Sequence, residues 1–301
     1  MSKTILVTGA TSGIGLELVK SLLSLKHKVI IASRNLTKVN ETVAELSKTY
    51  ESTLMVGMKL DVSSLASVAA FAKEFKEKFS QLDVLVLNAG ITAKDKQMSV
   101  DGYESTFATN YLGHYYLVEL LKPVLKSTAK GPARIVIMGS SIHDPKDGPI
   151  LEDVHGWHQP VKFDVFHAYR TSKLANAIHG NALSRQLDPK ETTVVNYSPG
   201  LIAETGLLKE QGFMAAFFVN MIVLHAKISA WMGTPKPVSS YDRTIPFLTK
   251  IAVEDQYVVK TGEYYNIDAI DKTSEFASKL ESQDELMKLS HELVSSKGFE
   301  F

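Results

Sequence analysis

A tyrosine and a lysine, Tyr169 and Lys173, stand four residues apart in a stretch whose pattern predicts a helix over 168–187. Residues at positions i and i+4 share one face of a helix, so the two side chains point the same way. A phenol titrates near pH ~10 and exchanges protons poorly at neutrality. We expect the Lys173 ammonium to lower the pKa of Tyr169 and make it a general acid or base. Solvated helices also carry this pair, so its meaning depends on the elements around it.

Short apolar runs alternate with amphipathic stretches from the start of the chain. The apolar runs predict strands at residues 5–7, 29–32, 54–60, 84–87, 134–138, 192–197 and 262–267. Such alternation is typical of an α/β fold in which a parallel, doubly wound sheet is covered by helices on both faces. No linker, repeat or low-complexity tract interrupts the pattern, which predicts a single domain over residues 1–301.

Two stretches depart from this alternation. Residues 144–165 lack periodicity and are predicted to form a loop, and residues 207–241 are predicted to form a mostly helical, lid-like insertion. Both follow strands, and ligands of open α/β sheets bind at the carboxyl ends of strands. Near the C-terminus, Leu286, Leu289 and Leu293 have helical spacing and are expected to pack on the domain.

The composition excludes several classes of function. Lys plus Arg and Asp plus Glu both number 33, so neither a nucleic-acid partner nor a polybasic membrane surface is expected. The chain has no cysteine, which excludes disulfides, thiolate nucleophiles and Cys-ligated metals. His155 and His158 lack accompanying ligands, so we expect no metal. The first residues lead directly into a strand, no run reaches the roughly 18 apolar residues that span a bilayer, and we expect a cytoplasmic protein.

A glycine-rich turn follows the first apolar run and precedes the first predicted helix. Glycines let the backbone approach a pyrophosphate, and the helix N-terminus offers free N–H groups. The context predicts a dinucleotide site. Its contacts are expected from Gly9, Thr11, Ser12, Gly13, Ile14 and Gly15.

The end of the second strand indicates which dinucleotide binds. An acidic residue there would accept the ribose hydroxyls of NAD. This chain has Ser33 and Arg34 instead, with Lys38 one turn later. Because a guanidinium group pairs well with a 2′-phosphate, we expect NADP(H).

Together these motifs resemble the short-chain dehydrogenase/reductase family over nearly the whole chain, which implies a Rossmann-type fold. The resemblance adds an active-site Asn110 and a catalytic Ser141 after the fifth strand. It also implies further cofactor contacts, at Asp61, Val62, Asn88, Ala89, Gly90, Tyr169, Lys173, Pro199, Gly200, Ile202 and Thr205.

The resemblance also implies a mechanism. Tyr169 would exchange a proton with the substrate oxygen while hydride moves between NADP(H) and carbon. Ser141 would stabilise charge on that oxygen, although the adjacent Ser140 is an alternative. Lys173 would bind the nicotinamide ribose and lower the pKa of Tyr169, and Asn110 would hold a water molecule that links Lys173 to solvent.

The chain looks most similar to the branch that contains retinol dehydrogenases and light-dependent protochlorophyllide reductases. This implies a hydrophobic carbonyl or alcohol as substrate, and the apolar run 213–224 lies where the family has its substrate lid. That run could line a pocket, contact a membrane surface or fill the core. A double-bond reductase of the protochlorophyllide type is an alternative, although its substrate-site cysteine is missing. A non-catalytic NADPH-binding regulator is another, and the oligomeric state, monomer or homodimer, stays open.

Overall fold

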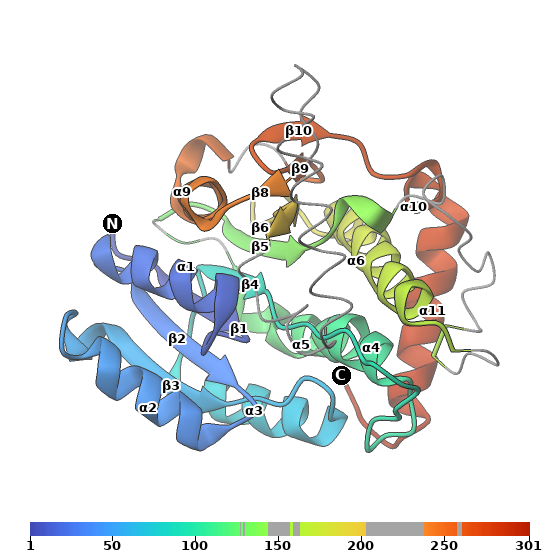
Figure 1. The fold of residues 1–301 in the computed structure, drawn as a ribbon, viewed down its shortest axis with the longest axis horizontal. Coiled ribbons are helices and arrows are strands. Elements are labelled where there is room, and N and C mark those ends of the chain that lie inside the picture. The colour runs from blue at the N-terminus through green and yellow to red at the C-terminus, as the bar shows by residue number, and fades with distance from the viewer. Residues whose placement is uncertain (127, 129, 144–156, 159–162, 203–237, 258–260) are drawn as a thin grey trace.

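The structure, a computed structural model, describes residues 1–126, 128, 130–143, 157–158, 163–202, 238–257 and 261–301 (Figure 1). An eight-stranded sheet in the order β10-β9-β6-β5-β4-β1-β2-β3 forms its centre. Its strands are β1 (Thr4–Thr8), β2 (Lys28–Ser33), β3 (Met55–Lys59), β4 (Val84–Leu87), β5 (Ala133–Met138), β6 (Thr192–Ser198), β9 (Tyr264–Asn266) and β10 (Ala269–Asp271). All neighbours pair in parallel except β9 and β10.

The central strands are apolar without alternation because both faces of the sheet are covered. Every residue of β4 and of β5 is buried. All seven predicted strands are confirmed, each within a few residues of its predicted bounds. The edge strand β10 was not predicted, since its three residues are exposed and leave no apolar run in the sequence.

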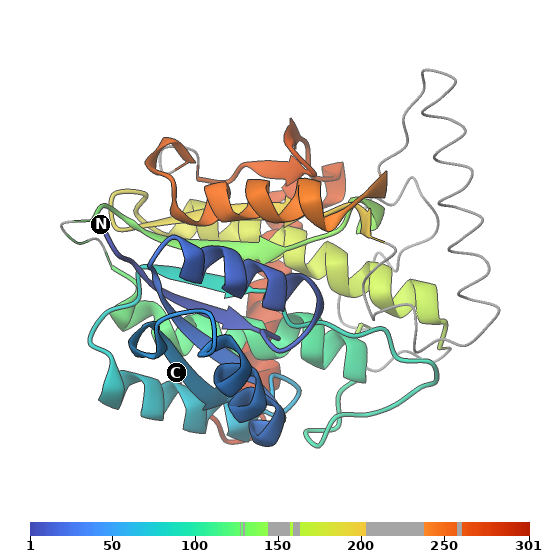
Figure 2. The same ribbon diagram turned by 60° about the vertical axis from the view of Figure 1, so that its left-hand side comes forward.

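Helices cover both faces of the sheet, as the sequence predicts. One apolar core lies between the sheet and α1, α2 and α9, and includes Leu18, Val39 and Leu248. Figure 2 shows α9 (orange) lying across this face near α1. Its helices are α1 (Gly13–Ser24), α2 (Leu36–Leu46) and α9 (Tyr241–Val253).

The larger core lies on the other face, where Phe71, Leu117 and Ile178 meet. The α11 helix packs along α6, and the expected stripe of Leu286, Leu289 and Leu293 is buried in this core. Its helices are α3 (Leu65–Lys78), α4 (Ser105–Phe107), α5 (Gly113–Leu121), α6 (Val165–Gln186), α10 (Glu275–Ser278) and α11 (Leu280–Ser295). One π-helical turn, Ala108–Leu112, joins α4 to α5.

The structure corrects two predicted boundaries. The α6 helix begins at Val165 rather than residue 168, because the Asp164 side chain accepts a hydrogen bond from the His167 amide and caps it. The lid-like insertion does not remain helical to residue 241, since Val238–Ser239 forms strand β8, which pairs with β7 (Leu201–Ile202). The rest of the insertion, including 213–224, lies outside the described residues, as does most of the predicted loop 144–165.

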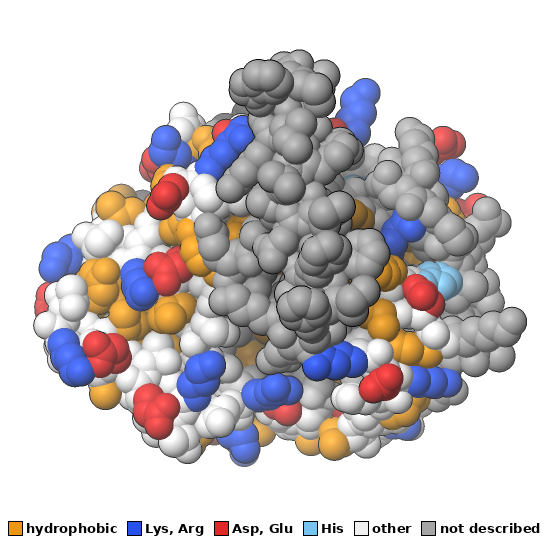
Figure 3. All heavy atoms as spheres, viewed as in Figure 1, with side chains coloured by type: hydrophobic (Ala, Val, Ile, Leu, Met, Phe, Trp, Pro, Cys, Tyr) orange, Lys and Arg blue, Asp and Glu red, His pale blue; other side chains and the backbone are white. Residues whose placement is uncertain are grey.

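The described surface matches the balanced composition. Figure 3 shows basic and acidic side chains interspersed over one face. Within the described residues, no helix is long and apolar enough to cross a membrane. Trp157, which lies between His155 and His158 in the sequence, is 2% exposed and packs in the larger core.

Candidate active site

The glycine turn after β1 has the tight geometry that the sequence predicts. Gly9 has φ +65° and Gly13 has φ +57°, a region that favours glycine. A Cβ atom at position 15 would lie 2.5 Å from the Gly9 carbonyl oxygen. Asn35 and Ser64 cap α2 and α3, but within the described residues Ser12 makes no side-chain hydrogen bond to α1. The first N–H groups of α1 are therefore available to an anion.

A buried network ties this turn to the end of β4. The Thr8 hydroxyl oxygen accepts hydrogen bonds from the backbone amides of Asn88 and Ala89, both at 2.9 Å. The Asn88 side chain donates to the Thr8 carbonyl oxygen at 2.8 Å. His114 completes the network, with Nε2 2.9 Å from the Thr8 hydroxyl and Nδ1 3.2 Å from the Asn110 carbonyl oxygen. Burial lowers the pKa of His114 to about 4, so the ring is neutral.

Three cations gather beside the end of β2. Arg34 and Lys38 are exposed, and Ser33 accepts a hydrogen bond from the Thr11 hydroxyl at 3.2 Å. Lys59, which the sequence reasoning missed, stands opposite Ser33 in the β2–β3 register and is exposed. Paired residues of parallel strands share a face, so Lys59 lies on the side of Ser33. None of these three cations forms an ion pair with any residue that the structure describes.

The turn after β3 is packed against the start of α5. Asp61 accepts hydrogen bonds from the amide and hydroxyl of Ser63, at 3.0 Å and 2.6 Å. A Cβ atom at position 113 would lie 1.7 Å from the Val62 carbonyl oxygen, so only glycine fits there. The expected cofactor contacts, Asp61 and Val62, are therefore held in place by protein contacts of their own.

Tyr169, Lys173 and Ser140 meet at the carboxyl end of β5. The Ser140 side chain lies near the Tyr169 hydroxyl, close enough to lower its pKa. Lys173 Nζ lies 5.6 Å from the centre of the Tyr169 ring and donates to the Met138 carbonyl oxygen at 2.8 Å. The geometry therefore favours Ser140, the alternative, over Ser141, which begins the 3₁₀ turn Ser141–His143.

The expectation of a lowered pKa for Tyr169 is wrong for this arrangement, because burial outweighs the neighbouring ammonium. Burial raises the pKa of Tyr169 to about 12, against a smaller opposing effect of the Ser140 hydrogen bond. Burial also lowers the pKa of Lys173 to about 8. In the described part of the chain, no carboxylate pairs with Lys173, so desolvation decides both values.

Asn110 is fully buried in the π-helical turn, and its side chain is committed to protein contacts. The amide nitrogen Nδ2 donates to the Ile91 carbonyl oxygen at 3.0 Å and to the Ser172 hydroxyl at 2.9 Å. The amide oxygen accepts from the Ile91 backbone at 2.7 Å. Ser172, also missed from the sequence, donates to the Tyr169 carbonyl oxygen at 2.7 Å. Asn110 thus joins the loop after β4, with Gly90, to α6.

The turn after β6 lies beside the same edge of the sheet. Gly200 has φ +72°, and the Pro199 carbonyl oxygen accepts from the Thr244 hydroxyl at 3.3 Å. Ile202 is 3% exposed and sits in β7. Thr205 lies outside the described residues.

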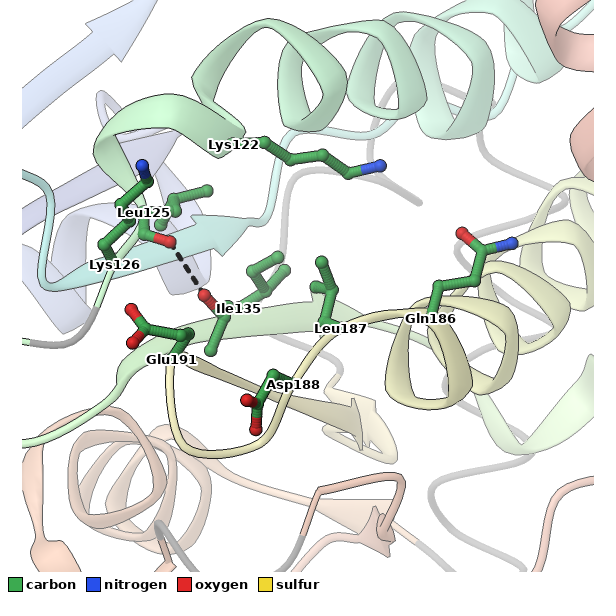
Figure 4. Close-up of a pocket in the computed structure, with 9 residues that line it drawn as sticks. Lys122, Leu125, Lys126, Ile135, Gln186, Leu187, Asp188 and Glu191 are labelled. Atoms are coloured by element: carbon green, nitrogen blue, oxygen red, sulfur yellow. Dashed lines mark hydrogen bonds between the residues drawn. The ribbon is translucent and has the colours of Figure 1, made fainter.

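A cavity lies far from these residues. It measures about 490 Å³ and is formed by the ends of α5 and α6 and the starts of β5 and β6 (Figure 4). Lys122 and Lys126 line one side, and Asp188 and Glu191 line the other. Because ligands of open α/β sheets bind at the carboxyl ends of strands, this cavity is not part of the candidate site.

Comparison with known proteins assigns the family. The family model for short chain dehydrogenases matches residues 3–147. The chloroplastic short-chain dehydrogenase TIC 32 A of Brassica napus is 33% identical over 97% of this chain and 89% of its own length. Human retinol dehydrogenase 14 is 34% identical over 66% of this chain and 62% of its own length.

A solved structure agrees with these sequence matches. An uncharacterised protein from Mycobacterium paratuberculosis superimposes with a TM-score of 0.70 at 25% identity, over 97% of this chain and 93% of its own. The chain belongs to the short-chain dehydrogenase family of oxidoreductases, which bind nicotinamide cofactors. The match to retinol dehydrogenase 14 confirms the predicted branch.

Proposed function

We propose that the protein is an NADP(H)-dependent oxidoreductase that transfers hydride between the nicotinamide and a carbonyl or alcohol carbon of a hydrophobic substrate. The placement of the Ser140 hydroxyl beside the Tyr169 hydroxyl carries the proposal, because it brings two proton-bearing groups together at the carboxyl end of β5. Lys173 lies on the same face of α6. The open N-terminus of α1 and the glycines of the β1–α1 turn suit a pyrophosphate beside this group.

The residues have distinct roles in reduction. A bound nicotinamide supplies the hydride. Tyr169 donates its proton to the substrate oxygen, and its pKa of about 12 keeps the phenol protonated at neutral pH. Ser140 donates a hydrogen bond to the same oxygen and stabilises the charge that develops there. The Lys173 ammonium stabilises the phenolate that remains.

Asn110 has a narrower role than the family resemblance implies. Its side-chain oxygen and nitrogen are engaged by Ile91 and Ser172. A water molecule in the proton relay would therefore bind the Asn110 backbone carbonyl, whose oxygen also lies 3.2 Å from His114 Nδ1. The side chain instead fixes the loop after β4.

The preference for NADP(H) rests on Arg34, Lys38 and Lys59. Arg34→Ala should reduce the preference for NADPH over NADH by about tenfold or more, since a charge-assisted, bidentate pair is lost. Lys59→Ala should reduce it by roughly two- to fivefold, as expected for an exposed charge. Lys48→Ala is the matched control, because Lys48 pairs with Glu45 at the far end of α2. An unchanged preference in Arg34→Ala would remove the argument for NADP(H).

The class of substrate is supported by the apolar sequence 213–224 and by the name of retinol dehydrogenase 14. NADPH oxidation should be fastest with long, apolar aldehydes or ketones. Matched retinal, steroid, aliphatic and aromatic carbonyls compared at equal concentration would show this. A cytoplasmic location and peripheral contact with membranes belong to the same proposal, and fractionation with vesicles tests the latter.

Tyr169→Phe tests the proposed function directly. Turnover should fall by about 100-fold or more, because the proton donor is lost, while the dissociation constant for NADPH stays within about threefold. A regulator that binds NADPH without turnover would keep its regulatory activity in Tyr169→Phe. Turnover that survives in Tyr169→Phe would rule out the proposed mechanism.

The two serines can be separated by paired variants. Ser140→Ala should lower the hydride-transfer rate by about 10- to 100-fold, since a donor to the developing oxyanion is lost. Ser141→Ala should leave that rate within about threefold. The opposite ranking would restore Ser141 as the catalytic serine.

A further inference from the structure

A buried histidine stands directly behind Ser140. His143 is 3% exposed and ends the 3₁₀ turn that follows Ser140. Its Nδ1 atom lies 2.7 Å from the Ser140 carbonyl oxygen. The His143 backbone amide donates to the same oxygen at 3.2 Å. One residue therefore holds this carbonyl with both its main chain and its side chain.

The far side of the ring fixes its tautomer. The Ser274 backbone N–H lies 3.0 Å from His143 Nε2, and a backbone N–H can only donate. Nε2 must therefore carry the lone pair, and the proton of the neutral ring must be on Nδ1. The Nδ1–H group then donates to the Ser140 carbonyl oxygen. The Ser274 amide thus ensures that His143 presents a hydrogen-bond donor to this oxygen.

Tyr264 of β9 closes the arrangement from the side. Its ring centre is 5.0 Å from that of His143, and its hydroxyl is 3.4 Å from Nδ1. A Cβ atom at position 139 would lie 3.5 Å from the Tyr264 ring, so the ring contacts the backbone before Ser140. Tyr264 and Ser274 both come from the C-terminal part of the chain. This part of the chain therefore contacts the turn that contains Ser140.

We propose that His143 is a positioning residue for the reaction: locked as the Nδ1–H tautomer by Ser274, it holds the Ser140 backbone and aims the Ser140 hydroxyl at Tyr169. This inference rests on the proposed function. An oxyanion donor acts only when it is placed in advance, and a misplacement of about 1 Å can cost on the order of 100-fold in rate. The sequence reasoning did not select His143.

Ser274 offers a matched pair of variants. Its φ of −57° suits proline, so Ser274→Pro removes the N–H donor and places the proline Cδ against His143 Nε2, which breaks the contact that fixes the tautomer. Ser274→Ala keeps the N–H, and both variants lose the cap that the Ser274 hydroxyl gives to the Ala277 amide. Hydride transfer should be about tenfold or more slower in Ser274→Pro than in Ser274→Ala, with equal NADPH affinity. Equal rates in the two variants would overturn the inference.

Substitutions of the ring provide a second test if Ser274→Pro does not fold. His143→Asn places an amide N–H near the position of Nδ1–H and should recover most of the rate lost in His143→Phe. A purely structural histidine predicts the reverse, since the aromatic ring fills the buried site better. A rate in His143→Phe equal to or above that in His143→Asn would contradict the inference.

The tautomer itself can be read without activity. In ¹⁵N-histidine-labelled protein, the His143 signals, assigned by their loss in His143→Phe, should show a protonated Nδ1 and an unprotonated Nε2. A protonated Nε2 would overturn the inference. If Tyr169→Phe stayed active, the proposed function would fail even though this tautomer was found. If Tyr169→Phe were inactive but the tautomer were wrong, only the role of His143 would fail.

Discussion

The two ends of the sheet hold buried charge differently. At the amino ends of the strands, Asp83 accepts hydrogen bonds from the Thr4 amide at 2.7 Å and from Lys130 Nζ at 2.8 Å. There the guanidinium of Arg134, 1% exposed, donates to the carbonyl oxygens of Ile251 and Glu254, and burial lowers its pKa to about 10. At the carboxyl ends, Lys173 is 6% exposed and is held by the Met138 carbonyl.

This difference separates stability from chemistry. Asp83 is a buried charge with a cationic partner, which the folded state tolerates, whereas Lys173 is a buried ammonium with no carboxylate partner among the described residues, which costs free energy and shifts its pKa. The amino ends are built to hold the sheet together. At the carboxyl ends, the free energy of desolvating Lys173 is spent where the proposed reaction needs its ammonium and the protonated phenol of Tyr169.

The largest expected effect comes from removing Lys173, which pairs with no carboxylate among the described residues. Lys173→Met should lower turnover by about 100-fold or more, because the phenolate of Tyr169 loses its stabilising charge. The free energy of unfolding at pH 7 should stay unchanged or rise by up to about 3 kcal/mol, since a desolvated ammonium is removed. Denaturant unfolding beside steady-state kinetics measures both. A marked loss of stability would erase the contrast between the two ends.

At the amino ends of the strands, substitution of Asp83 should affect stability rather than turnover. Asp83→Ala should lower the free energy of unfolding by about 3 kcal/mol, because Lys130 and the Thr4 amide lose their buried acceptor. The kcat and KM of the folded fraction should stay within about twofold. A variant that unfolds normally but turns over slowly would show that Asp83 serves the site rather than the sheet.

A smaller effect is expected from two buried histidines, His114 and His179, when each is replaced by phenylalanine. His114→Phe should cost roughly 1–2 kcal/mol and weaken NADPH binding, because the bridge from Thr8 to Asn110 is broken. His179→Phe is the matched control, since His179 is also buried but its Nε2 has no partner in the described residues. Thermal unfolding with and without NADPH compares the two. Equal losses in both variants would mean that His114 has only a packing role.

Much of the fold and of the candidate site at the carboxyl ends of the strands could be predicted from the sequence. The apolar strands and the glycine turn are local patterns, and Tyr169 and Lys173 are related by a helical repeat, so each leaves a readable signal. His143 and Ser274 are far apart in the chain and meet only through tertiary packing. Lys59 follows from strand register, which an apolar run does not specify.

The pKa of Tyr169 shows a different limit. A helical repeat places an ammonium near the phenol, but it says nothing about how deeply both are buried. Desolvation then outweighs the pairing and moves the pKa of Tyr169 up rather than down. The choice between Ser140 and Ser141 likewise depends on how the turn after β5 is held, which the pair of serines does not reveal.

The pH dependence of stability follows from the same cation. The folded pKa of Lys173 is about 8, below its value of 10.5 in an open chain, so the unfolded state binds more protons between these values. Lys173 should therefore make the protein more stable as the pH rises from about 8 to about 10.5. In Lys173→Met this contribution should disappear.

The rate of hydride transfer as a function of pH tests the central claim most directly. Single-turnover reduction by NADPH should be constant below pH 8 and fall as the pH rises through about 8, because Lys173 loses its proton while Tyr169, with a pKa of about 12, keeps its own. The residual rate of Lys173→Met should show no such fall. A wild-type rate that stayed flat to pH ~10 would contradict the claim that the reaction depends on the buried Lys173 ammonium.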